Sequence, residues 1–208
     1  MSQESCRAAE MLSVETCRNE LSNCPNVLIE TVEWKRTVLQ RVEEADISKR
    51  LQMRVSDNTI LYHHRIRISV SGCPNCCSKP QIADFGIVGH VSPAVNTDTC
   101  TVCGACRDVC PDTAITVNNA PPLFERDKCL GCVKCREICQ NGSIILLDQG
   151  VRLLVGGKLG RHPQLAQVIA EFDELDVVVQ RIGQIVEEYI ECADSAERFA
   201  DFWIRTHN

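Results

Sequence analysis

Two runs of cysteine with the same internal spacing lie in the middle of the chain. Each run reads Cys-x2-Cys-x2-Cys-x3-Cys, and the second repeats the first at an offset of 29 residues. This spacing is typical of paired [4Fe–4S] clusters, in which three cysteines of one run and the fourth of the other hold each cluster. The predicted ligands are Cys100, Cys103, Cys106 and Cys139 for one cluster, and Cys129, Cys132, Cys135 and Cys110 for the other.

Zinc and disulfide bonds are the alternatives for so many thiols. Zinc sites usually take four ligands from separate Cys-x2-Cys pairs, and the runs of this chain do not divide in that way. Disulfides belong to oxidising compartments, but the N-terminal sequence MSQESCRAAEML lacks the basic and apolar regions of a secretory signal. We therefore expect a reducing, cytoplasmic location, and an anaerobic one because exposed clusters are sensitive to oxygen.

The segment that carries the two runs, residues 95–147, resembles a bacterial-type two-cluster ferredoxin. The repeat extends beyond the thiols, since Asp98 and Asp127 each precede the first cysteine of a run by two residues. One departure is Gln140, which stands where a second proline is usual. The departure leaves all eight ligands in place.

Hydrophobic periodicity on both sides of this segment predicts an α/β unit. Residues 64–70 alternate polar and apolar side chains, which predicts a strand that leads into the turn-rich loop 71–80 with Cys73, Cys76 and Cys77. Further strands are expected at 85–91 and 151–155, the second of which ends at the glycine-rich turn 156–163.

Helices are expected where apolar residues recur at three, four and seven positions. One should begin at Pro25, which would place Cys24 at its N-terminus, and a second should run from Asp46 to about Val55. Residues 1–24 are polar. The remaining helices are predicted at about 164–172, 175–192 and 194–205.

Three motifs in this unit carry a second resemblance. GCPNCCSKP at 72–80, DFGIVG at 84–89 and GGKLGRHP at 156–163 are similar to the sirohaem and [4Fe–4S] domain of the nitrite/sulfite reductase family. The resemblance implies an α+β fold, in which a reductase-type α/β domain at 1–94 and 148–208 is interrupted by the ferredoxin-like insertion at 95–147. The chain looks like a small dissimilatory-type member of that family.

In this family two cysteine pairs hold a [4Fe–4S] cluster, and the last thiolate also bridges to the sirohaem iron. The resemblance makes Cys73 and Cys77 the second pair, with Cys77 as the bridging ligand, and Cys17 and Cys24 the first pair. The gap between Cys17 and Cys24 is one residue longer than the family's usual gap, and Cys6 could substitute. Cys76 has no counterpart and is interpreted as structural, and Cys192 as a small buried hydrophobe. The implied cofactors are therefore three [4Fe–4S] clusters and sirohaem.

Sirohaem carboxylates and an oxyanion substrate both need cations and close backbone donors. The residues predicted for this role are Arg65, Arg67, Lys79, Lys158 and Arg161, together with Gly156, Gly157 and Gly160, where the backbone can approach an anion closely. Basic residues taken singly are more often solvated charges, and no histidine is assigned a catalytic role.

These assignments predict a redox protein that passes electrons to a cysteine-bridged [4Fe–4S]–sirohaem centre, where an oxyanion such as sulfite or nitrite is reduced. We expect the smaller domain that precedes this unit in complete enzymes of the family to be absent, so that a second copy or a partner subunit supplies the rest of the pocket. The alternatives are an electron-transfer protein with no catalysis of its own and a tetrapyrrole carrier, and the sequence leaves open whether the chain is an enzyme.

Composition and motifs restrict the partners. The net charge of −6 argues against nucleic acid, and no apolar run approaches the roughly 20 residues needed to span a bilayer. GGKLGR lacks the G-x-G-x-x-G order of a dinucleotide site. Electrons are therefore expected to come from another protein.

Overall fold

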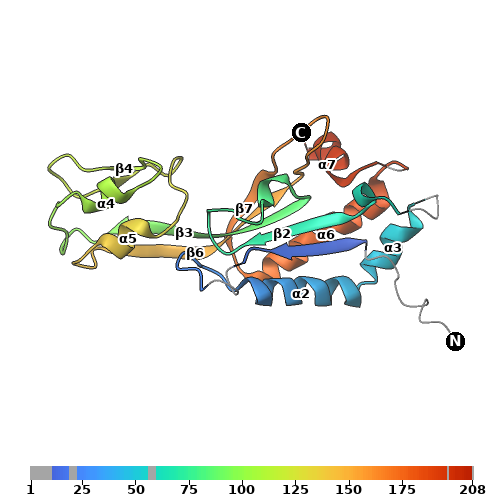
Figure 1. The fold of residues 1–208 in the computed structure, drawn as a ribbon, viewed down its shortest axis with the longest axis horizontal. Coiled ribbons are helices and arrows are strands. Elements are labelled where there is room, and N and C mark those ends of the chain that lie inside the picture. Colours follow the sequence, from blue (N-terminus) through green and yellow to red (C-terminus); the bar gives the residue numbers. More distant parts are fainter. Residues whose placement is uncertain (1–10, 19–22, 56–59, 196, 208) are drawn as a thin grey trace.

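A five-stranded mixed sheet forms the centre of the protein (Figure 1). The computed structural model describes residues 11–18, 23–55, 60–195 and 197–207. The order of the strands across the sheet is β1-β2-β3-β6-β7. Their bounds are Leu12–Thr16 for β1, Ile66–Ser71 for β2, Phe85–Val95 for β3, Ile144–Val155 for β6 and Gln167–Asp173 for β7.

The direction of the strands changes across the sheet. Strand β2 runs parallel to β1 and to β3, and its pairing places Leu12 beside Ile66 and Ile68 beside Phe85. Strand β6 is antiparallel to both β3 and β7. The chain therefore leaves β1 and β2 at the same end of the sheet, whereas it leaves β6 at the opposite end.

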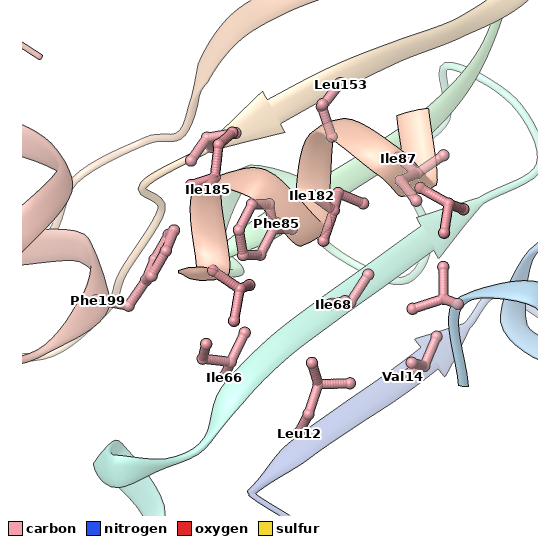
Figure 2. Close-up of a cluster of buried hydrophobic side chains, with 14 of the residues drawn as sticks. Leu12, Val14, Ile66, Ile68, Phe85, Ile87, Leu153, Ile182, Ile185 and Phe199 are labelled. Carbon is pink, nitrogen blue, oxygen red and sulfur yellow. The ribbon is translucent and has the colours of Figure 1, made fainter. Parts of the chain in front are cut away.

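The hydrophobic core lies between the sheet and four helices, which are α2 (Thr31–Glu44), α3 (Ile47–Met53), α6 (Leu175–Cys192) and α7 (Phe199–His207). Figure 2 shows side chains from neighbouring strands, among them Ile68 and Phe85, meeting Ile182 and Ile185 of α6. Phe85 is fully buried, and its ring centroid lies 4.7 Å from that of Phe199 in α7.

The second face of β2 and β3 is covered by the loop that joins them. Ser69 Oγ donates a hydrogen bond to the Ser78 carbonyl oxygen at 2.7 Å, and the hydroxyls of Ser71 and Ser78 are also 2.7 Å apart. A Cβ at Gly86 would lie 2.5 Å from the Pro80 carbonyl oxygen. Both faces of β2 are thus buried, which the alternating pattern of its sequence did not predict.

The two longest strands extend beyond the other three and carry the segment with eight cysteines. Between β3 and β6, this eight-cysteine segment (residues 96–143) contains α4 (Ala105–Val109), β4 (Ile115–Thr116), β5 (Leu123–Phe124) and α5 (Lys134–Ile138). It forms the end of the molecule away from α3, α6 and α7 (Figure 1). Ile115, Cys135 and Ile144 are the buried residues of its small separate core.

The sequence repeat in this segment is also a repeat of backbone conformation. Left-handed residues occur at Val102 and Gly131, at Gly104 and Val133, and at Thr113 and Gly142, which are pairs at the 29-residue offset. The two halves therefore fold alike even where only one of them has glycine.

The fold class expected from the sequence is confirmed, because the structure combines a mixed sheet with covering helices. Helices 47–53 and 175–192 and the strand 66–71 occur near their predicted positions. The strands predicted at 85–91 and 151–155 are also present, but they are longer than predicted and span 85–95 and 144–155. The last helix begins at Phe199, five residues later than expected. No helix of the described residues is both long and apolar enough to cross a bilayer.

The helix predicted from Pro25 begins only at Thr31, so the expectation that Cys24 lies at a helix N-terminus is wrong. The backbone N–H groups of Leu28 and Ile29 instead donate to the Gly72 carbonyl oxygen, at 2.8 and 3.4 Å. These long-range hydrogen bonds hold the chain in a loop where the periodicity alone predicted a helix.

Two other segments also differ from the prediction. Residues 167–173 form strand β7 and not a helix, because β6 offers a free edge, where the β-branched Val168 and Ile169 are well suited to a strand. Strand β1 was not predicted, although Leu12 and Val14 are buried in the core.

Replacing Phe85 by alanine should lower the free energy of unfolding by about 3–5 kcal/mol, because it empties a fully buried aromatic site. Leu147→Ala is the control, since Leu147 on the exposed part of β6 is 59% accessible and should change stability by less than about 0.5 kcal/mol. Denaturant titration followed by circular dichroism measures both. Equal losses would contradict the placement of the core.

Candidate iron–sulfur centres

The parallel pairing of β1 and β2 brings two distant cysteines together at one end of the sheet. Cys17 directly follows β1, and Cys73 comes two residues after β2. The Cys17 N–H donates to the Val70 carbonyl oxygen at 3.0 Å, and the Gly72 N–H donates to Cys17 Sγ at 3.2 Å. These contacts fix the two thiol loops against each other.

A cavity of about 600 Å³, which we call the third cavity, opens between these loops. The cysteines that line it are Cys17, Cys24, Cys73 and Cys77, which is the set that the family resemblance implies for a third cluster. Cys73 is buried and Cys77 is exposed at the cavity. Cys6 lies outside the described residues, and Cys76 does not line the cavity.

The buried Cys73 thiol, which lines this cavity, is poorly suited to carry a charge by itself. Burial raises the pKa of the Cys73 thiol, and the nearby Cys24, Cys77 and Cys17 thiols raise it further. Ligating cysteines must be deprotonated, so four thiolates at this spacing need a cationic group between them. The donor set and the space therefore fit a [4Fe–4S] cluster.

The eight-cysteine segment contains two further cavities, and each is lined by one predicted ligand set. Cys100, Cys103, Cys106 and Cys139 line a cavity of about 490 Å³. Cys110, Cys129, Cys132 and Cys135 line a smaller one of about 20 Å³. We call these groups the first and the second ligand set. The fourth cysteine of each run thus turns toward the other run, as the spacing predicts.

The fourth cysteine of each run accepts a similar hydrogen bond from the backbone. The Ala114 N–H donates to Cys110 Sγ at 3.4 Å, and the Ser143 N–H donates to Cys139 Sγ at 3.2 Å. Burial acts to raise the pKa of Cys139, but hydrogen bonds from the backbone N–H groups of Ile144 and Ser143 outweigh it, so the pKa is lowered. Burial raises the pKa of Cys135 to about 12.

The space between the thiols differs among the three sites. It is about 490 Å³ for the first set and about 600 Å³ between the loops of Cys17 and Cys73, but only about 20 Å³ for the second set. Within the described ranges, no three His, Cys, Asp or Glu side chains converge on one point.

The predicted cations are divided between the two ends of the sheet. Lys79 lines the third cavity, together with Arg18, which sequence reasoning missed although it directly follows Cys17. Arg67 lies near the start of β2, six residues and therefore about 20 Å from Cys73 along an extended chain. It donates to the Ile82 carbonyl oxygen at 2.6 Å, and its Nε lies 4.0 Å from Asp84.

The glycine-rich turn lies at the same end as Arg67. The Gly156 and Gly157 N–H groups donate to the carbonyl oxygens of Asp84 and Ala83, at 2.9 and 3.0 Å. Lys158 forms an ion pair with Asp201 of α7. Arg65 is half-buried just before β2, and Gly160 and Arg161 are exposed in the turn.

The described residues therefore gather a cluster site at the third cavity but only part of the cation set predicted for sirohaem. Cys77 is exposed there, and Lys79 and Arg18 line the same cavity. The other predicted cations and glycines lie elsewhere, where Arg67 and Lys158 have internal partners.

Comparison with known proteins gives one family across nearly the whole chain. The profile described as "Nitrite and sulphite reductase 4Fe-4S domain" matches residues 12–206. A coenzyme F420-dependent sulfite reductase of Methanocaldococcus jannaschii is 32% identical over 176 residues, which is 85% of this chain and 26% of that protein. One of the subunits of an anaerobic sulfite reductase of Salmonella typhimurium is 36% identical over 69 residues, covering 33% of this chain and 19% of that one.

Two solved structures have a fold similar to that of this chain. Dissimilatory sulfite reductase I aligns with a TM-score of 0.57 at 16% identity, covering 94% of this chain and 50% of the other. The NirA protein of Mycobacterium tuberculosis aligns with a TM-score of 0.51 at 18% identity, covering 93% of this chain and 25% of the other. The chain spans about a quarter or less of the length of the curated relatives named above.

Cys17→Ser should remove the iron and labile sulfide of one cluster and leave those of the other two, because Cys17 lines only the third cavity. Cys192→Ser is the control and should keep the full content, since this thiol lies outside all three cavities and is exposed, not buried as its apolar neighbours predicted. Iron and sulfide assays on anaerobically purified protein measure the difference. Full content in Cys17→Ser would show that another thiol completes the site.

Proposed function

Because the chain belongs to the nitrite and sulphite reductase 4Fe-4S domain family, we propose that it is an iron–sulfur redox protein with three centres. In this proposal the eight-cysteine segment is the ferredoxin-like part, within residues 95–147, and its two centres supply electrons to the third. Residues 1–94 and 148–208 form the reductase-type domain that holds this third centre.

The observation that supports the proposal is the division of twelve cysteines among three cavities. Each cavity is lined by one complete ligand set and by no cysteine of another set among the described residues. Cysteines far apart in sequence, such as Cys17 and Cys73, meet only because of the strand pairing. A purely structural role for these thiols does not account for that division.

Sirohaem is the cofactor that we propose beside the third cluster, with the exposed Cys77 thiolate as its axial ligand. When bound, sirohaem supplies an iron at which an oxyanion such as sulfite or nitrite can lose oxygen as water. Lys79 and Arg18 line the same cavity. They can attract and orient an anion, because charged donors bind oxyanions strongly.

The proposal also includes a partner that completes the cofactor pocket. The curated relatives are much longer than the chain, and the cation set at the third cavity is incomplete without Arg65, Arg67, Lys158 and Arg161. We propose that a second copy or another redox subunit supplies the remaining contacts, and that a protein donor delivers the electrons.

The second candidate is an electron-transfer protein with no catalysis of its own. The internal pairing of Arg67 with Asp84 and of Lys158 with Asp201 favours it, because these cations are already engaged within the chain. The two candidates share the three clusters and differ in the tetrapyrrole and in the chemistry at Cys77.

The absorption spectrum and metal content of anaerobically purified protein separate the candidates. A tetrapyrrole Soret band with iron for three clusters plus the haem is expected for the reductase. Iron for three clusters without that band supports the electron-transfer protein. Iron for only two clusters, or zinc in place of iron, would contradict the third centre.

Cys77→Ser should abolish the tetrapyrrole band and the turnover of sulfite or nitrite with reduced methyl viologen, because it removes the bridging thiolate. The spectra of the two clusters that we propose at the first and second ligand sets should be unchanged. Cys76→Ser is the matched control, since this neighbouring thiol does not line the cavity. An unaltered haem spectrum in Cys77→Ser would make the axial assignment wrong.

A further inference from the structure

His90 connects the eight-cysteine segment to the sheet. It lies in β3, is only 4% exposed, and its Nδ1 is 3.1 Å from the Leu130 carbonyl oxygen. A carbonyl only accepts hydrogen bonds, so Nδ1 carries the proton and Nε2 is the acceptor. Nε2 faces the Arg152 guanidinium at 3.3 Å.

The neighbours of His90 hold this orientation. Its ring lies 4.7 Å from the Phe172 ring, and Arg152 is paired with Glu171 at 2.6 Å. Burial lowers the pKa of His90, and the adjacent Arg152 lowers it further, which agrees with a neutral imidazole that donates through Nδ1. One histidine thus joins strands β3, β6 and β7 to the loop that contains Leu130.

This loop belongs to the second ligand set, since Leu130 and Gly131 lie between Cys129 and Cys132. A Cβ at Gly131 would lie 2.5 Å from His90 Nδ1, so only glycine permits the close approach. The Arg126 side chain adds a hydrogen bond to Ser92 Oγ at 2.7 Å, one residue beyond Val91 on β3. The loop is therefore fixed to β3 on both sides of Leu130.

The loop of the third centre touches the same strand one residue earlier. A Cβ at Gly89 would lie 2.9 Å from the carbonyl carbon of Gly72, the residue before Cys73. Gly89 and His90 are adjacent in β3, and adjacent residues of a strand project to opposite faces. The second ligand set and the third centre thus approach the same two residues of β3.

The first ligand set lies farther along the strand. Its cavity is lined by Ser143 and Ile144, and Ile144 pairs with Val95 at the end of β3. Val95 is four residues beyond Val91, which corresponds to about 13 Å along a strand. The second ligand set therefore contacts β3 closer to the third centre than the first ligand set does.

We propose that the second ligand set, Cys110, Cys129, Cys132 and Cys135, holds the centre that exchanges electrons with the third centre, and that His90 is the residue that positions it. The first ligand set then receives electrons from a one-electron protein donor. Each electron oxidises the donor and reduces the first centre, and it then passes singly through the second centre to the third, with no bond made or broken. This inference rests on the proposed function.

Electron paramagnetic resonance of the fully reduced, anaerobic protein tests the order of the centres. Spin–spin coupling falls steeply with distance, so the signal of the third centre should be broadened mainly by the second. Cys132→Ser should remove this broadening, and Cys103→Ser, the matched ligand change in the first set, should keep it. The reverse result would overturn the order.

The role of His90 is tested by rapid freeze-quench measurement of electron arrival at the third centre. His90→Leu should slow this arrival by about tenfold, as is common when a partner of a metal-binding loop is lost. Cys132→Ser gives the background rate at which reduced methyl viologen reduces the third centre directly. His90→Asn should restore most of the rate, because its amide nitrogen can donate from nearly the position of Nδ1.

The outcomes distinguish this inference from the proposed function. If His90→Leu and His90→Asn are equally slow, or both as fast as the natural protein, at full iron content, the positioning role of His90 is wrong. Absence of a third-centre signal in the natural protein would overturn both the proposed function and this inference. A normal third-centre signal that neither serine variant alters would overturn the inference alone.

Discussion

The parallel pairing of β1 with β2 is the constraint on which the third centre depends. It places the residues after both strands at one edge of the sheet, so that Cys17 and Cys73 meet although more than fifty residues separate them. The pairing is stabilised by the burial of Leu12, Val14, Ile66 and Ile68 against the helices (Figure 2). Core packing therefore determines where the two thiol loops meet.

The antiparallel pair β3 and β6 extends this geometry to the other cysteines. Both strands continue past the other three strands of the sheet (Figure 1). The eight-cysteine segment contacts β3 as far back as His90, whose Nδ1 lies 3.1 Å from the Leu130 carbonyl oxygen. A flexible linker would leave the position of the eight-cysteine segment relative to the sheet undefined. The paired strands, the close contact at Gly131 and the buried His90 define that position.

Burial disfavours the charged, thiolate form of cysteines in each group of thiols. Burial raises the pKa of Cys73, Cys106, Cys129 and Cys135, so each of these sites disfavours thiolates until a cation is present. The backbone N–H groups around Cys139 act in the other direction. In the proposal of three iron–sulfur centres, iron binding and folding would be coupled, because the metal would stabilise an arrangement of charges that the protein alone does not.

Local spacing predicted the two groups of four in which the eight cysteines of the central segment line its two cavities, because the repeat needs no knowledge of distant contacts. The family resemblance and most strands could also be predicted, since these depend on short motifs and periodicity. Local patterns did not predict strands β1 and β7 or the true start of α2. They also did not predict that Arg67 and Lys158 lie at the other end of the sheet from Lys79. Those features were decided by tertiary contacts, namely the Gly72 carbonyl that accepts from Leu28, the free edge of β6, and the carboxylates of Asp84 and Asp201. A side chain's partner is selected by packing across the whole chain, and no local pattern contains that information.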